Sequence, residues 1–139
     1  MAIDRMDWHY GDDFPEDLPD ENGGTHIGIY LAWIINNDLQ GEFHTEESAE
    51  ALQDVKNRKI TGRDFLIEQC DEKFWEEDLN DEGLAFTEFY YSKTYFDDYA
   101  ETLTENLPSI YHVENTWENY DKIALVIAKR FEEWKGNNS

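Results

Sequence analysis

The chain has 139 residues, which is the size of a single domain. Hydrophobic residues make up 40% of it and aromatic residues 15%, a composition that excludes a disordered acidic tail and predicts a folded core. Acidic residues outnumber basic ones by 33 to 11, for a formal net charge of −22. This charge argues against direct binding to nucleic acid or to an anionic membrane and leaves basic proteins or cations as partners.

The first segment, residues 1–24, is expected to be an extended acidic arm, because its prolines and glycines interrupt any periodic pattern. Its aromatic side chains predict that the arm packs on the domain, and Trp8–Tyr10 is a candidate for a short β pairing. The N-terminus has acidic residues where a signal peptide has a basic region, and the longest apolar run spans only about half a bilayer. We therefore expect a cytoplasmic protein.

A buried helix is predicted over residues 26–37, where the sequence is apolar on every face, with Thr25 as its N-cap. A surface helix is expected over residues 45–58, because only one narrow stripe of this segment is apolar. A third helix should follow Thr61, which can form a capping box with Asp64. The single cysteine lies in the apolar stretch of this third helix, which favours a small core residue.

A long amphipathic helix is predicted over residues 81–103, with aromatic side chains on its buried side. Residues 110–113 are expected to form a short extended piece. The last helix is predicted over residues 116–135, where apolar residues recur three and four apart, and Gly136 is expected to end it.

These elements predict a mainly α fold: a single-domain bundle of about five helices with an extended N-terminal arm and a short β pairing. Residues 1–24 would be the acidic arm packed on the domain, residues 25–136 the helical domain, and residues 137–139 a frayed tail. No internal repeat or linker divides the chain.

The sequence has no recognisable catalytic or cofactor-binding motif. A glycine-rich phosphate loop, a nucleophile elbow, and the His-Glu-x-x-His and Cys-x-x-Cys patterns are all absent from it. We therefore predict that the protein is not an enzyme and has no catalytic residue, cofactor or dedicated metal site. His9 and His26 flank the acidic arm, so a metal site built from these histidines and carboxylates remains the alternative.

Two segments, residues 74–78 and 95–99, mix aromatic with acidic side chains and are candidates for a partner-binding surface. Aromatic anchors ringed by carboxylates suit an interface with a basic partner, where the rings supply affinity and the charges steer the encounter. The competing interpretation is that the rings face the core while the acids face water. The candidate partner-binding residues, from these segments and from the arm, are Phe74, Trp75, Glu76, Glu77, Asp78, Tyr95, Asp97, Asp98, Asp12, Asp13 and Asp17.

Four blocks of the sequence resemble a family of small acidic bacterial proteins of unknown function. The blocks begin at His26 (HIGIYLAW), Thr61 (TGRDFL), Asp78 (DLNDEGLAFT) and Thr116 (TWENY). The resemblance extends from about His26 to Trp134 and implies no catalytic residues. Proteins that are similar to this family include immunity-like partners of bacterial toxins.

The predicted function is that of an immunity protein, which neutralises a cognate basic toxin by binding it. A nuclease toxin exposes a basic cleft to its substrate, so an acidic protein can block that cleft and capture the toxin quickly through opposite charge. The alternative is a non-catalytic adaptor or a self-assembling protein of bacterial or phage origin, which leaves a homo-oligomer open. The acidity also has a simpler interpretation, in which it only keeps the protein soluble.

Overall fold

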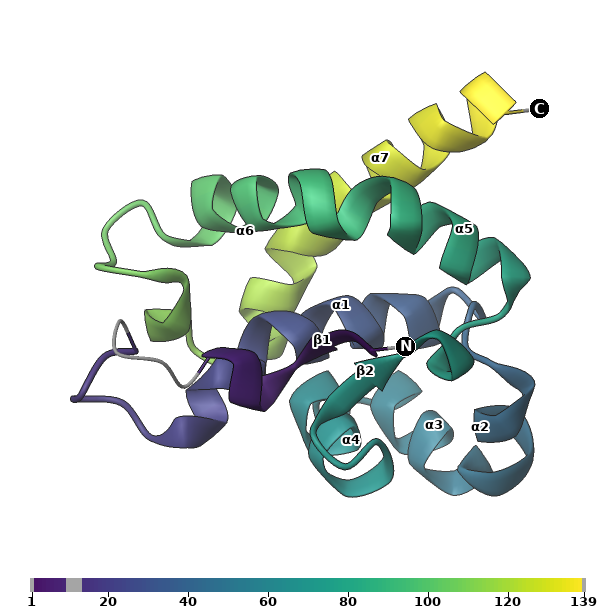
Figure 1. Cartoon of the computed structure of the whole chain (residues 1–139), viewed down its shortest axis with the longest axis horizontal. Coiled ribbons are helices and arrows are strands. Elements are labelled where there is room, and N and C mark those ends of the chain that lie inside the picture. The colour runs from purple at the N-terminus through teal and green to yellow at the C-terminus, as the bar shows by residue number, and fades with distance from the viewer. Residues whose placement is uncertain (1, 10–13, 139) are drawn as a thin grey trace.

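The computed structural model describes residues 2–9 and 14–138 and shows a mainly α-helical fold with a small two-stranded antiparallel sheet (Figure 1), as predicted. The strands are β1 (Ala2–Arg5) and β2 (Lys73–Trp75). The α-helices are α1 (Thr25–Asn36), α2 (Glu42–Glu47), α3 (Ala49–Lys56), α4 (Gly62–Gln69), α5 (Asp81–Tyr90), α6 (Phe96–Leu103) and α7 (Trp117–Asn138). Short 3-10 helices cover Met6–His9, Asp20–Gly24, Glu76–Asp78 and Ile110–His112.

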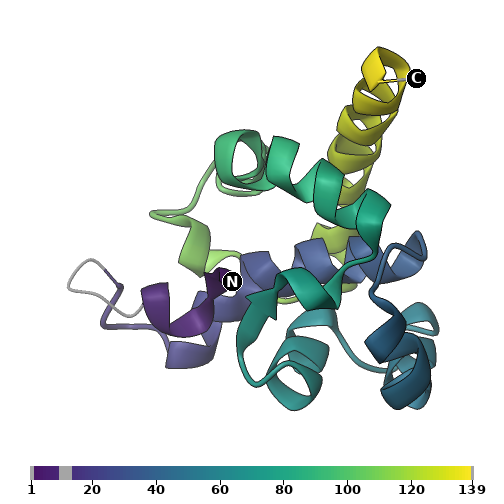
Figure 2. The ribbon, with the colours of Figure 1, turned by 45° about the vertical axis from the view of Figure 1, so that its right-hand side comes forward.

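Helix α1 lies at the centre of the molecule, as its apolar sequence predicts. Helices α2, α3 and α4 lie on one side of it and helices α5 and α6 lie on the other, while α7 crosses behind (Figures 1 and 2). Every residue from Thr25 to Ile35 is buried. Thr25 is the first residue of α1 and the N-cap position is Gly24, so the predicted cap is wrong. The Thr25 hydroxyl instead accepts a hydrogen bond from Arg63 Nη1 at 3.0 Å.

Helices α1 and α4 approach each other closely through a pair of glycines. A Cβ atom on Gly28 would collide with the backbone of Arg63, and one on Gly62 would collide with the backbone of Gly28. Only glycine allows two backbones to come this near. The N-terminus of α4 is fixed by the predicted capping box, in which Thr61 and Asp64 bond each other's backbone N–H groups.

The small sheet joins the start of the chain to its middle. Strand β1 pairs antiparallel with β2, with Asp4 opposite Phe74 and Arg5 opposite Lys73. The pairing predicted for Trp8–Tyr10 is therefore misplaced: Trp8 lies in a 3-10 helix, and Tyr10 is outside the described residues. The sheet places the buried Phe74 ring and the Asp4 side chain in the interior of the fold.

The helix predicted over residues 45–58 is two shorter helices. Helix α2 begins earlier, at Glu42, and the helical conformation is interrupted at Ser48 before α3 begins. The reason is tertiary: the break turns the His44 side chain into the interior, where its Nε2 atom meets Asp78 Oδ1 at 2.6 Å. A surface amphipathic pattern contains no sign of this inward polar contact.

The predicted helix over residues 81–103 is present but is interrupted by a π-helical segment, Tyr91–Tyr95. The inserted turn lets Tyr90, Tyr91, Tyr95 and Tyr99 all point into the core. Residues Ile110–His112 form a 3-10 helix, so the predicted extended piece is wrong. Helix α7 continues through Gly136 to Asn138, and Ser139 lies outside the described residues. Among the described helices, none is long and apolar enough to cross a membrane.

Candidate functional site: two buried histidine clusters and an acidic groove

Four of the residues predicted for a partner surface are buried in the interior. Phe74 and Tyr95 have no exposed surface, and Asp78 and Asp98 are 6% and 5% exposed. Asp98 accepts hydrogen bonds from Tyr90 Oη at 2.7 Å and from Arg130 Nε at 3.0 Å. The rings of Phe74 and Tyr95 therefore face the core, as the competing interpretation of the sequence pattern predicts.

The other predicted residues are accessible or lie outside the described chain. Glu77, Asp97 and Asp17 are exposed, and Asp17 Oδ2 lies 3.2 Å from His112 Nε2. Trp75 and Glu76 are half-buried. Helix α6, which carries Asp97, and β2 lie apart in both ribbon views (Figures 1 and 2), so the two segments do not form one continuous patch. Asp12 and Asp13 lie outside the described residues.

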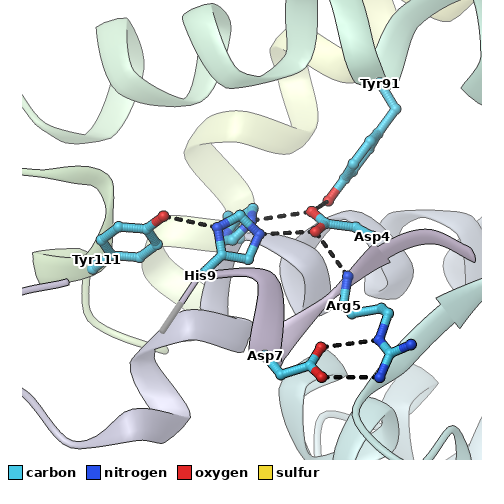
Figure 3. Close-up of polar contacts among 7 residues, drawn as sticks. Asp4, Arg5, Asp7, His9, Tyr91 and Tyr111 are labelled. Atoms are coloured by element: carbon cyan, nitrogen blue, oxygen red, sulfur yellow. Dashed lines mark hydrogen bonds and ion pairs between the residues drawn. The ribbon is translucent and has the colours of Figure 1, made fainter. Parts of the chain in front are cut away.

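The structure instead brings the buried Asp4 and His26 together with the partly buried His9 in a group that we call the N-terminal cluster. Figure 3 shows Asp4 and His9 with their polar partners. Asp4 Oδ1 accepts from the backbone N–H of Arg5 and lies 2.8 Å from His9 Nε2. Asp4 Oδ2 accepts from Tyr91 Oη at 2.7 Å and lies 3.3 Å from His26 Nε2. Each carboxylate oxygen therefore has two partners.

The hydrogen bonds of the N-terminal cluster favour the ionised form of Asp4. Burial alone would raise the pKa of Asp4, but the hydrogen bonds from His26 and His9 outweigh it and hold that pKa far below its usual range. Burial lowers the pKa of His26, although Asp4 opposes the shift. Burial, followed by the charge of Asp4, raises the pKa of Tyr91, so its hydroxyl stays a donor. The cluster holds β1 against α1 and the π-helical turn.

A second buried group, which we call the cysteine cluster, consists of His44, Cys70 and Asp78. His44 Nε2 lies 2.6 Å from Asp78 Oδ1 and 3.8 Å from Cys70 Sγ, while Cys70 Sγ lies 3.7 Å from the same Asp78 oxygen. Burial, followed by the Asp78 carboxylate, raises the pKa of the Cys70 thiol well above its usual range. The thiol is therefore no nucleophile in this state.

Sequence reasoning missed the cysteine cluster because its three members come from three separate elements. His44 belongs to α2, Cys70 follows the last residue of α4, and Asp78 ends a 3-10 helix. Their spacings of 26 and 8 residues match no motif for a metal or a catalytic site. The N-terminal cluster has one detectable signal, since His9 and His26 were already a candidate pair for a metal.

An acidic groove of about 280 Å³ lies between α3 and α4, beside the cysteine cluster. Its lining residues are Glu47, Ser48, Glu50, Ala51, Asp54, Ile60, Glu68 and Gln69. None of the four carboxylates forms an ion pair in the described part of the chain. This α3–α4 groove is thus a concave site with negative charge and no lysine or arginine in its lining.

Most basic residues are already paired with acids elsewhere. Within the described residues, eight of the 11 lysines and arginines make ion pairs, and they are Arg5, Lys56, Arg58, Arg63, Lys73, Lys122, Arg130 and Lys135. This pairing concentrates the uncompensated negative charge on the remaining carboxylates. The groove carboxylates belong to that uncompensated set.

Comparison with known proteins gives one family match. The model of a domain of unknown function, DUF7832, matches residues 2–113. No curated protein and no solved structure matches the chain. Both histidine clusters and the α3–α4 groove lie within the matched residues, whereas α7 lies beyond them. Since the match covers most of its length, the chain belongs to the DUF7832 family of uncharacterised domains.

Proposed function

We propose that this chain is a non-catalytic binding protein of the immunity class, which neutralises a cognate basic toxin in the bacterial cytoplasm. Binding would place a basic segment of the toxin in the α3–α4 groove. The observation that carries the proposal is the groove itself, where four carboxylates without ion-pair partners line one concavity. Lysine and arginine side chains of a partner are the groups that complement such a site.

An exposed aromatic residue lies beside the groove and supports an interface there. Phe43 is 57% exposed on α2, and Glu47 of the groove follows it four residues later. Residues four apart share one face of a helix. An aromatic anchor next to unpaired charge is a common composition at the centre of protein interfaces.

The high negative charge of the whole chain supports rapid capture of a basic toxin. Long-range attraction raises the association rate and is screened by salt, so binding should weaken as ionic strength rises. The exposed Glu77 and Asp97 would contribute to this steering at a distance from the groove. Contacts within the groove would determine the dissociation rate.

The test compares two variants that lose the same charge. The groove variant carries Glu47→Gln, Glu50→Gln, Asp54→Asn and Glu68→Gln, and the control carries Glu101→Gln, Glu105→Gln, Glu114→Gln and Glu132→Gln, which are exposed elsewhere. Tagged forms of both and of the original chain are used to capture partners from the source cell, and affinities are then measured with the purified partner. We expect the groove variant to bind roughly tenfold or more weakly and the control to stay within about threefold.

The immunity class is tested with the captured partner. Expressed alone, the partner should arrest growth, and co-expression of this chain should restore it, whereas co-expression of the groove variant should not. Equal loss of binding in the two variants would show that only net charge matters and would contradict the groove assignment. A partner that is harmless when expressed alone would contradict the immunity class.

Self-assembly is a second candidate function, and one observation favours it. The C-terminal part of α7 projects beyond the rest of the fold (Figures 1 and 2). Leu125 on this helix is 76% exposed, next to Val126 in a shallow groove. If this face joins two copies, sedimentation should show a dimer that Leu125→Glu dissociates. A monomer at all concentrations would exclude this candidate.

A further inference from the structure

Both ring nitrogens of His44 have a polar partner in the interior. Ser48 Oγ donates to Gln69 Oε1 over 3.2 Å, so it faces His44 Nδ1, also at 3.2 Å, as an acceptor. In the tautomer that matches this arrangement, Nδ1 carries the hydrogen and Nε2 directs its lone pair at Asp78, whereas in the other tautomer Nε2 donates to Asp78 Oδ1.

The Nε2 atom of His44 points at a carboxylate oxygen. Asp78 Oδ1 lies 2.6 Å away, and its partner oxygen, Oδ2, already accepts the backbone N–H of Trp75 at 2.7 Å. Two acceptors at this distance repel each other unless a cation lies between them. A proton on Nε2 satisfies this pair, and the Cys70 thiol, whose sulfur lies within 3.8 Å of both atoms, donates to Asp78 Oδ1. A metal ion bound to the three atoms would replace both hydrogens.

We propose that the cysteine cluster is a binding site for a divalent transition metal of the zinc class, held by His44 Nε2, Cys70 Sγ and Asp78 Oδ1. One nitrogen, one sulfur and one oxygen donor are a ligand set that zinc accepts. Ser48 acts as the outer partner that orients the imidazole, as hydrogen-bonded neighbours do at metal sites. This site is separate from the proposed function in the groove.

The separations of the donor atoms are close to those of a tetrahedral zinc ion. Zinc–ligand bonds of about 2.0–2.3 Å place sulfur about 3.6 Å from a nitrogen or oxygen ligand, and nitrogen about 3.4 Å from oxygen. The two sulfur distances of 3.8 and 3.7 Å agree with this geometry. The His44–Asp78 distance of 2.6 Å must open by about 0.8 Å, which is the change expected when a metal replaces a hydrogen bond. Three protein ligands leave the fourth position for solvent.

The acidic groove lies next to the cysteine cluster. Ser48, which hydrogen-bonds both His44 and Gln69, lines the groove together with Gln69. Negative charge at the mouth of a buried site raises the local concentration of cations.

The N-terminal cluster is the weaker candidate for the same metal. Both oxygens of Asp4 already have two partners. One partner of each oxygen is a donor that keeps its hydrogen at neutral pH: the backbone N–H of Arg5 for Oδ1 and the Tyr91 hydroxyl for Oδ2. In the cysteine cluster, by contrast, His44 Nε2, Cys70 Sγ and Asp78 Oδ1 hydrogen-bond one another through hydrogens that a metal ion can replace.

Cobalt(II) is the probe that tests the site, because it reports its ligands by absorption. Added to metal-stripped protein, it should bind with one equivalent and give a thiolate-to-cobalt band in the near ultraviolet together with visible bands of a tetrahedral ion. Zinc should displace it, raise the unfolding temperature and release at least one proton per ion, since the Cys70 thiol must ionise. Absence of the thiolate band, or of any bound ion, would overturn the proposal.

Variants separate this site from binding elsewhere on an acidic surface. Cys70→Ser should remove the thiolate band and weaken zinc binding by roughly 100-fold or more, and Ser48→Ala should weaken it by roughly tenfold. His9→Gln, in the other cluster, is the matched control and should leave the band and the affinity unchanged. Circular dichroism checks that each variant folds. A stoichiometric ion that survives Cys70→Ser but is lost in His9→Gln would place the metal at the N-terminal cluster and overturn the assignment.

Discussion

The N-terminal cluster and the cysteine cluster contain similar residue types but differ in how their carboxylate is held. In the first, Asp4 accepts two bonds at each oxygen and holds three elements together. In the second, His44 Nε2, Cys70 Sγ and Asp78 Oδ1 converge on one point, and the Cys70 thiol donates to Asp78. A buried carboxylate between donors acts as a structural pin, whereas converging nitrogen, sulfur and oxygen atoms form a ligand set for a metal ion.

This contrast predicts that the largest loss of stability follows from removing the carboxylate of the structural pin. Asp4→Ala would leave the buried donors of His26 and Tyr91 unpaired, so the free energy of unfolding should fall by about 3–5 kcal/mol. Urea unfolding measures the change. Asp7→Ala is the control, because Asp7 pairs with Arg5 at the surface, and its effect should stay below about 0.5 kcal/mol. Equal effects of the two substitutions would contradict the role of Asp4.

The second-largest effect is the difference in unfolding free energy between losing a hydrogen bond to a charged group and losing one to a neutral group. Tyr91→Phe removes the donor to ionised Asp4 and should cost about 2 kcal/mol of unfolding free energy. Tyr30→Phe removes a bond of similar length to the neutral Thr87 hydroxyl and should cost about 1 kcal/mol. Both rings are buried, so the packing change is matched. A larger cost at Tyr30 would indicate that Asp4 is not ionised in the folded protein.

The cysteine cluster should respond to metal rather than to substitution alone. In metal-free protein, Cys70→Ala should cost only about 1 kcal/mol, since the thiol forms weak contacts there. Saturating zinc should widen the difference in unfolding temperature between the original chain and this variant, because the ion stabilises only a chain that binds it when folded. A difference that stays constant with zinc would remove the distinction between the clusters.

The smallest effect is a pH dependence that belongs to the N-terminal cluster. The pKa of His26 is lower in the folded than in the unfolded chain, so the unfolded chain binds more protons and stability is lost as pH falls below about 6.5. The depressed pKa of Asp4 acts in the same direction at lower pH, where the carboxylate of the unfolded chain becomes protonated. His26→Gln should flatten the loss between about pH 7 and about pH 5, measured by urea unfolding at each pH. The general relief of charge repulsion on acidification is common to both proteins and cancels in the difference.

The sequence was sufficient for features that depend on local patterns. The apolar run of α1 predicted a central helix, and the Thr61–Asp64 pair predicted a capping box. Both signals are local, because each lies within a single helix or its first turn. It failed for the break at Ser48 and the π-helical turn at Tyr91–Tyr95. Both irregularities serve side chains that point to distant partners, and no local periodicity records such a partner.

The composition of the chain determined that it would be acidic and built around aromatic residues, and its apolar periodicity predicted that it would be mainly helical. Only the tertiary structure decided which acids are buried pins, which line a groove and which face water. Asp4 and Asp78 are chemically identical to Asp17 and Asp97 along the chain, and they differ in burial and partners. Those differences arise from contacts between residues far apart in sequence: 87 positions separate Asp4 from Tyr91, and 34 separate His44 from Asp78. A single sequence does not encode such contacts in any short-range pattern, so the sites became visible only when the chain was folded.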